Sequence, residues 1–152
     1  MTLTTARLIA IAGTTRDALN KIMDPARGGL RTPVPATLPG VARTFSRENG
    51  LEVAFIVALG RVGIPSVLAR HFAYAWVEKD RVEQLAPYWA WNPRTDASAD
   101  PELSQLEFSQ DIPFVDLAFM LADSGPSETA LPAASLVAID RAEIVRRIAA
   151  AI

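Results

Sequence analysis

The sequence predicts an α+β protein, in which a helical front half is followed by a small α/β unit. Two observations support this. Up to about residue 78, apolar residues recur at the three- and four-residue spacing of amphipathic helices. After Pro87 the apolar residues alternate, with Trp89 and Trp91 two positions apart, which is typical of a strand. We therefore expect one domain over residues 1–82 and a second over residues 83–152.

Four helices are expected in the front half, each from its own start and stop signals. The first covers residues 6–12 and ends at Gly13, because glycine tolerates the left-handed conformation that follows many helices. Thr14 or Thr15 can cap the second, which runs through Met23. Ser46 caps the third, whose apolar stripe extends to Val62, and Ser66 caps the fourth, which reaches about Glu78.

Prolines and glycines dominate the segment between the second and third helices. Its flanks, residues 31–35 and 41–45, are expected to form the two arms of a small ribbon. Proline cannot donate to a strand ladder, so this ribbon would be short or would form an edge.

Strands are expected in the back half at residues 88–92, 104–110 and 135–139. The apolar stretch 114–121 fits a strand or a buried helix equally well, and residues 123–132 are expected to form a loop. Asp140 can cap a last helix over residues 141–150, with Ile144, Val145 and Ile148 directed inward.

Charge is divided unevenly between the two halves. Residues 1–72 hold nine Lys and Arg against four Asp and Glu, a net charge of +5, whereas residues 73–152 carry −7. A basic half suits a polyanionic partner, and an acidic half should face away from it. The chain has no cysteine, no apolar run long enough to span a membrane and no signal-peptide pattern at its start, so we expect a cytoplasmic protein.

Polar residues gather where a helix-turn-helix protein reads DNA. In that arrangement the second helix enters the major groove, where Arg can pair with guanine and Asn with adenine. A basic wing then holds the phosphates. We expect DNA contacts from the start of the second helix and from the wing, through Thr15, Arg16, Asn20, Lys21, Arg31, Arg43 and Arg47.

The order of these residues resembles the MerR-like winged helix-turn-helix family over residues 4–78. The segment Leu8–Leu19 is similar to the family's first helix, tight turn and recognition helix. Other similar pieces are the wing signature, the start of the following helix and the turn into the next one: Gly40, Arg43, Phe45 and Ser46; Glu48, Asn49 and Leu51; and Gly63–Ser66. The resemblance implies a DNA-binding transcription regulator or a phage-type accessory factor, with Thr15, Arg16, Asn20, Arg43 and Phe45 facing DNA.

The residues leave other functions open. The helix-turn-helix could be only the scaffold of a protein-interaction adaptor of the phage packaging or assembly type, and the last helix could form a homodimer seam. The acidic half would then bind a protein partner that the sequence does not identify. No catalytic set forms around His71, the single histidine, and Gly28-Gly29 lacks the Gly-Lys-Ser/Thr ending of a phosphate loop. We therefore expect no catalysis, no metal and no cofactor, with double-stranded DNA as the main partner.

Overall fold

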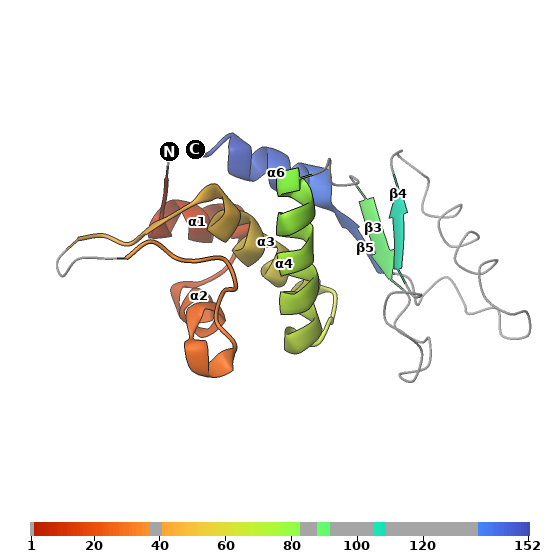
Figure 1. Ribbon diagram of the computed structural model, residues 1–152, viewed down its shortest axis with the longest axis horizontal. Helices are drawn as coiled ribbons and strands as arrows, with labels where there is room; N and C mark the ends of the chain where they lie inside the picture. Colours follow the sequence, from red (N-terminus) through yellow and green to blue (C-terminus); the bar gives the residue numbers. More distant parts are fainter. Residues whose placement is uncertain (1, 37–40, 83–87, 92–104, 109–136) are drawn as a thin grey trace, which may run out of the picture. The chain divides into compact units, whose positions relative to one another are not determined.

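The computed structural model describes residues 2–36, 41–82, 88–91, 105–108 and 137–152 (Figure 1). The chain divides into two compact units. Unit 1 comprises Met1–Leu85 and Glu143–Ile152, and unit 2 comprises Ala86–Ala142. The protein is α+β, as the sequence predicts, because helices dominate unit 1 and the described strands of unit 2 form an antiparallel sheet. The first boundary lies three residues from the expected one, but most of the C-terminal helix belongs to unit 1 instead of the second domain.

Unit 1 begins with strand β1 (Leu3–Thr4), followed by helices α1 (Thr5–Ala12) and α2 (Arg16–Met23). The 3-10 helix η1 (Pro25–Arg27) and strand β2 (Thr44–Phe45) precede the two longest helices, α3 (Arg47–Arg61) and α4 (Ser66–Val82). Helix α6 (Arg141–Ala149) ends the chain. The four expected front helices are thus all present, and α4 extends four residues beyond its expected end.

Local capping signals define the turn between α1 and α2. Gly13 adopts a left-handed conformation, with φ of 61°. The N–H of Gly13 donates to the Ala10 carbonyl at 3.3 Å and that of Thr14 donates to the Ile9 carbonyl at 3.1 Å. These two bonds form a Schellman motif, whose left-handed position favours glycine because glycine has no Cβ. Thr15 then caps α2, its hydroxyl accepting from the Ala18 N–H at 3.2 Å.

Helix α3 is the centre of unit 1. Ser46 and Asn49 form a capping box at its start, and nine of its residues are buried. At its end, the N–H of Ile64 donates to the Leu59 carbonyl at 3.1 Å while Gly63 adopts a φ of 86°. Against α4, the ring of Phe55 meets Trp76 edge-on, with centroids 5.2 Å apart. Burial of these large aromatic side chains accounts for much of the packing between α3 and α4.

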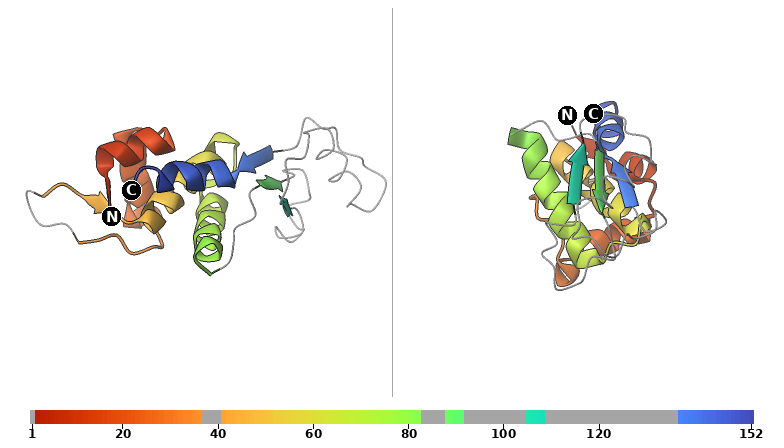
Figure 2. Two further views of the ribbon diagram at one scale, coloured as in Figure 1. Left: turned by 90° about the horizontal axis from the view of Figure 1, so that it is seen from above. Right: turned by 90° about the vertical axis from the view of Figure 1, so that its right-hand side faces the viewer.

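The two ends of the chain meet on α3. A side-chain carbon added at Gly50 would lie 2.5 Å from Cδ1 of Leu3 and 3.4 Å from Cδ1 of Ile148, so β1 and α6 pack at this glycine. Figure 2 shows the N- and C-termini close together in both of its views. Ile148 is fully buried, as expected, whereas Ile144 and Val145 are only partly buried. The last helix therefore completes the core of unit 1.

Strand β2 does not form the ribbon that the sequence predicts. It pairs with β1 in antiparallel register, Leu3 with Phe45 and Thr4 with Thr44. The described residues of the other expected arm, 31–35, form no strand. The prediction of a 31–35/41–45 ribbon is therefore wrong. Pro33 and Pro35 cannot donate to a ladder, and β1 supplies the free strand edge instead.

Unit 2 contains an antiparallel sheet of order β4-β3-β5, made of β3 (Tyr88–Trp91), β4 (Gln105–Phe108) and β5 (Val137–Asp140). Each lies inside or overlaps a predicted strand. Trp89 is fully buried opposite Ile139. The predictions for residues 114–121 and 123–132 lie outside the described residues, as does the side chain of Trp91. In the part of the chain that the structure describes, no helix combines the length and apolar character needed to cross a bilayer.

Candidate nucleic-acid interface

One face of α2 is polar and exposed. Thr15, Arg16, Asn20 and Lys21 are exposed, whereas Leu19 is fully buried and is the only fully buried residue of this helix. The buried leucine fixes which side of the helix faces the core. The start of α2 and its outer surface are therefore free to contact a partner, and the four expected side chains of α2 lie there together.

Arg43 lies near the other end of the same helix. Its Nη1 is 3.6 Å from Sδ of Met23, the last residue of α2. Arg43 and Asn20 also line one open groove of about 720 Å³, whose other walls come from η1 and residues 28–36. Arg43 is exposed. The structure therefore brings one expected phosphate-binding arginine beside Asn20 and Met23 of the expected reading helix, although they are 23 and 20 positions apart in sequence.

A buried arginine from α4 holds the C-terminus of α2. Arg70 is 8% exposed. Its Nη1 donates to the carbonyl of Ile22 at 2.8 Å and to that of Gly29, and its Nη2 donates to the carbonyl of Lys21 at 3.4 Å. The last carbonyls of a helix have no partner within the helix, and they mark the negative end of its dipole. Arg70 therefore satisfies the end of α2 and ties α2 to the loop that follows η1.

A buried carboxylate from α3 holds the next part of that loop. The carboxylate of Glu52 accepts hydrogen bonds from the N–H of Arg31 at 2.8 Å, from the N–H of Thr32 at 3.0 Å and from the Thr32 hydroxyl. Nδ2 of Asn49 donates to Oγ1 of Thr32 at 2.9 Å and to the carbonyl of Pro33 at 3.1 Å. Both α3 side chains are fully buried. They fix the backbone of Arg31 on the rigid helix α3.

The expected wing residues Arg31 and Arg47 have partners within the protein. The guanidinium carbon of Arg31 lies 5.6 Å from the ring centre of Tyr74, within cation–π range, although the residue is exposed. Nη1 of Arg47 lies 2.5 Å from Oδ2 of Asp80, and the Arg47 side chain is 37% exposed. The charge of Arg47 is partly offset by Asp80, although its other N–H groups can still donate. Arg47 is therefore the weaker phosphate-binding candidate of the two.

Phe45 does not face outward. The resemblance implies a DNA-facing aromatic residue at this position, but Phe45 is 0% exposed and pairs with Leu3 in the two-stranded sheet. Its strand directs alternate side chains to opposite sides, and the apolar one is in the core. The prediction that Phe45 contacts DNA is therefore wrong. The side chain of Phe45 belongs to the buried core instead.

The sequence did not identify four residues that hold α2 and the loop after η1 in place: Arg70, Glu52, Asn49 and Thr32. A signal was present for two of them. Arg70 and Glu52 occupy positions of the buried stripes of α4 and α3, three residues before the buried Ala73 and Phe55 respectively. A charged residue within an apolar stripe at helical spacing indicates a buried polar partner.

Charge separates the two units. By sequence, unit 1 holds thirteen Lys and Arg against eight Asp and Glu, a net charge of +5, and unit 2 carries two against nine, a net charge of −7.

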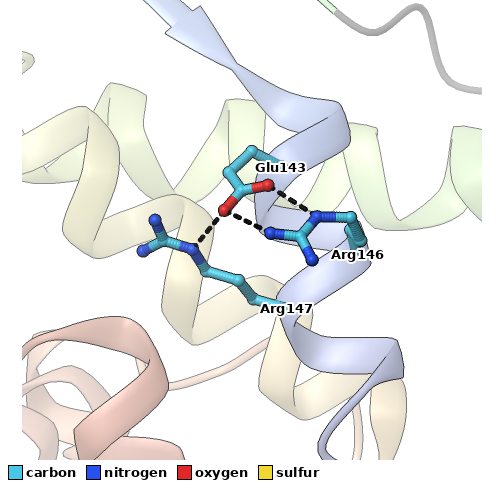
Figure 3. A network of polar contacts seen from close by, with 3 residues as sticks. All are labelled: Glu143, Arg146 and Arg147. Atoms are coloured by element: carbon cyan, nitrogen blue, oxygen red, sulfur yellow. Dashed lines mark hydrogen bonds and ion pairs between the residues drawn. The ribbon is translucent and has the colours of Figure 1, made fainter.

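Basic residues on α6 do not add a second comparable site, because Glu143 binds Arg146 and Arg147 at 2.8 and 2.7 Å (Figure 3). Hydrogen bonds from Arg146 and then from Arg147 lower the pKa of Glu143 to about 2. In Figure 1, α6 lies at the top of unit 1 and α2 at its bottom.

No model of a protein family, no curated protein and no solved structure matches the chain. In the ranges that the structure describes, no group of three or more His, Cys, Asp or Glu side chains is arranged to hold a metal ion. The surface of unit 1 is therefore the basis for a proposed function.

Proposed function

We propose that the chain is a DNA-binding protein of the MerR-like winged helix-turn-helix type, with α2 as the helix that enters the major groove. The observation that carries the proposal is the shared surface of α2 and Arg43. Thr15, which caps α2, is exposed together with the α2 residues Arg16, Asp17, Asn20 and Lys21. Arg43 shares a groove with Asn20. A helix that reads base edges needs such an exposed polar start, with basic residues nearby to grip the backbone.

Each exposed residue has a distinct role in this proposal. Arg16 and Asn20 are the candidates for base edges, because their side chains can form paired hydrogen bonds with guanine and adenine. Thr15 and Lys21 contact phosphates beside the groove. Arg43, which lines the same groove as Asn20, contacts the DNA backbone, and Arg31 contacts a further phosphate.

The charge distribution supports the same orientation. Unit 1 carries a net charge of +5, whereas unit 2 carries −7 and would be repelled by phosphates. Unit 2 would then bind a protein partner or a second copy of the chain. A transcription regulator or a phage-type accessory factor without catalysis fits this division of roles.

Fluorescence anisotropy of a labelled random-sequence duplex tests the proposal. We expect binding that weakens steeply with salt, with a log–log slope of roughly one unit for each phosphate contact. The double variant Arg16→Ala with Arg43→Ala should lose most of this binding. The matched control, Arg146→Ala with Arg147→Ala, removes the same formal charge from α6 and should bind much more tightly than the double variant.

Two results would reject DNA binding at this surface. One is no binding of wild-type protein at low salt. The other is an equal loss of affinity in the test and control variants, because it would show that only net charge matters. Either result favours the adaptor function, in which the helices are a scaffold and the acidic unit binds a protein.

A further inference from the structure

Helix α2 ends in a different way from helices α1 and α3. Helices α1 and α3 both end in Schellman turns with a left-handed glycine, Gly13 and Gly63. Helix α2 ends instead at Asp24, which is extended, with φ of −65° and ψ of 115°, and Pro25 follows. The sequence thus gives α2 no glycine to satisfy its last carbonyls.

The guanidinium of Arg70 takes that place. It donates to the carbonyls of Lys21 and Ile22 in the last turn of α2, and to the carbonyl of Gly29 beyond η1. Its planar fork can reach several carbonyls at once, whereas an ammonium offers donors from a single nitrogen. A cation at this end of α2 also opposes the negative end of the helix dipole.

Few other contacts fix the direction of α2. The helix has eight residues, and isolated helices of this length are marginal in water. Leu19 is its only fully buried residue, and Thr15 caps its start. Ala18, Ile22 and Met23 are only partly buried. We therefore expect the restraint at the C-terminus to have a large effect on the direction of the helix.

We propose that Arg70 is a positioning residue for sequence reading, which holds the C-terminus of α2 so that Arg16 and Asn20 meet base edges at a fixed angle. This inference rests on the proposed DNA-binding function. Hydrogen bonds to base edges need good distances and angles, whereas phosphate contacts carry no sequence information directly. Because Arg70 is buried, it supplies no phosphate contact of its own. Its loss should therefore reduce discrimination between sequences more than affinity for random DNA.

The test compares the wild type with Arg70→Met, which keeps a long apolar side chain, and with Arg70→Lys, which keeps the charge. The duplexes are one selected with wild-type protein from a random pool and one random duplex of equal length. For Arg70→Met we expect the affinity ratio between the two duplexes to fall about tenfold, the effect of losing roughly one paired base contact. Arg70→Lys should show a smaller fall. The salt slope on random DNA should not change in either variant.

The matched control is Arg81→Met on the same helix, where the Arg81 side chain is 68% exposed and pairs with Glu78. It should leave the affinity ratio unchanged. A purely structural defect lowers the concentration of folded protein and weakens binding to both duplexes alike, so it does not change the ratio. If Arg70→Met does not fold, the fall in ratio for Arg70→Lys decides the question.

The outcomes separate the two proposals. Wild-type protein that binds no duplex would overturn the DNA-binding function, and the reading role of Arg70 with it. Wild-type protein that selects a sequence, together with Arg70 variants that keep the wild-type ratio, would overturn only the positioning role. A smaller salt slope in the Arg70 variants would also contradict that role, because it would show that phosphate contacts were lost.

Discussion

Replacing Glu52 with alanine removes the acceptor that holds the loop at Arg31 and Thr32. The buried N–H of Thr32 and the Thr32 hydroxyl lose their acceptor, and the partly buried N–H of Arg31 loses its bond of 2.8 Å. Leaving one buried donor without a partner costs about 1–3 kcal/mol. The lost methylene groups leave a cavity, which adds roughly 1 kcal/mol or more. We therefore expect Glu52→Ala to lower the free energy of unfolding by about 3–5 kcal/mol.

Urea denaturation with linear extrapolation measures this change. Glu52→Gln keeps one acceptor oxygen in a side chain of the same size and should lose about half as much. The control is Glu78→Ala, because that side chain is 42% exposed and its pair with Arg81 spans 3.7 Å. The control should change stability by less than about 0.5 kcal/mol. If Glu52→Ala lies within about 1 kcal/mol of the wild type, the loop does not depend on this carboxylate and the reasoning is refuted.

Three further outcomes are expected. In the same urea assay, Gly13→Ala should lower the free energy of unfolding by about 1–2 kcal/mol, because φ is +61° and the new carbon would crowd Arg61. Gly60→Ala has open space around the new carbon and should raise the free energy of unfolding by about 0.5–1 kcal/mol. The pKa of Glu143 in the folded protein is about 2, below its ordinary value of 4.5, so the carboxylate stabilises the fold above about pH 4.5 and this stabilisation is lost as the pH falls toward 2. Glu143→Gln should therefore flatten the dependence of stability on pH in that window. An unchanged curve would contradict the role of Arg146 and Arg147. Arg47→Ala should weaken random-duplex binding in the anisotropy assay less than Arg43→Ala does, because Arg47 is paired with Asp80 whereas Arg43 is exposed. The reverse order would contradict the ranking of these two phosphate contacts.

Several helix boundaries of unit 1 were predictable because their signals are local, whereas Ser66, the expected cap of α4, is instead its first residue. Thr15 and Ser46 cap the helices that were expected to follow them, and Gly13 and Gly63 end the helices before them. A cap needs only a side chain within three residues of the N–H groups that it satisfies. Such contacts can therefore be predicted from a few adjacent residues of the sequence.

The contacts that shape the candidate interface were not predictable in this way. Arg70 meets α2 across 48 positions, and β2 pairs with β1 across about 40. Two-residue strands carry no usable alternation, so the sequence did not reveal that pairing or the burial of Phe45. The packing of α6 against Gly50 also depends on the return of the chain to unit 1, which no local signal records.

The exposed residues of α2 were predictable as a surface, because the apolar spacing at Leu19 identifies the opposite face. The sequence predicts that Arg43 belongs to a basic wing that contacts the same DNA, but not its contact with the end of α2. Whether this surface binds DNA is a chemical property that neither helix spacing nor burial measures, and it stays a prediction.

Mapping of amide chemical shifts by NMR tests the central claim most directly, because the 16.4 kDa chain suits the method and each residue reports separately. The labelled protein is titrated with a short duplex at low and at moderate salt. We predict that the largest shifts fall on Thr15–Lys21 and on Arg43, that they weaken with salt, and that Arg146 and Arg147 on α6 shift little. Shifts confined to α6, or no shifts at low salt, would contradict a DNA interface on α2.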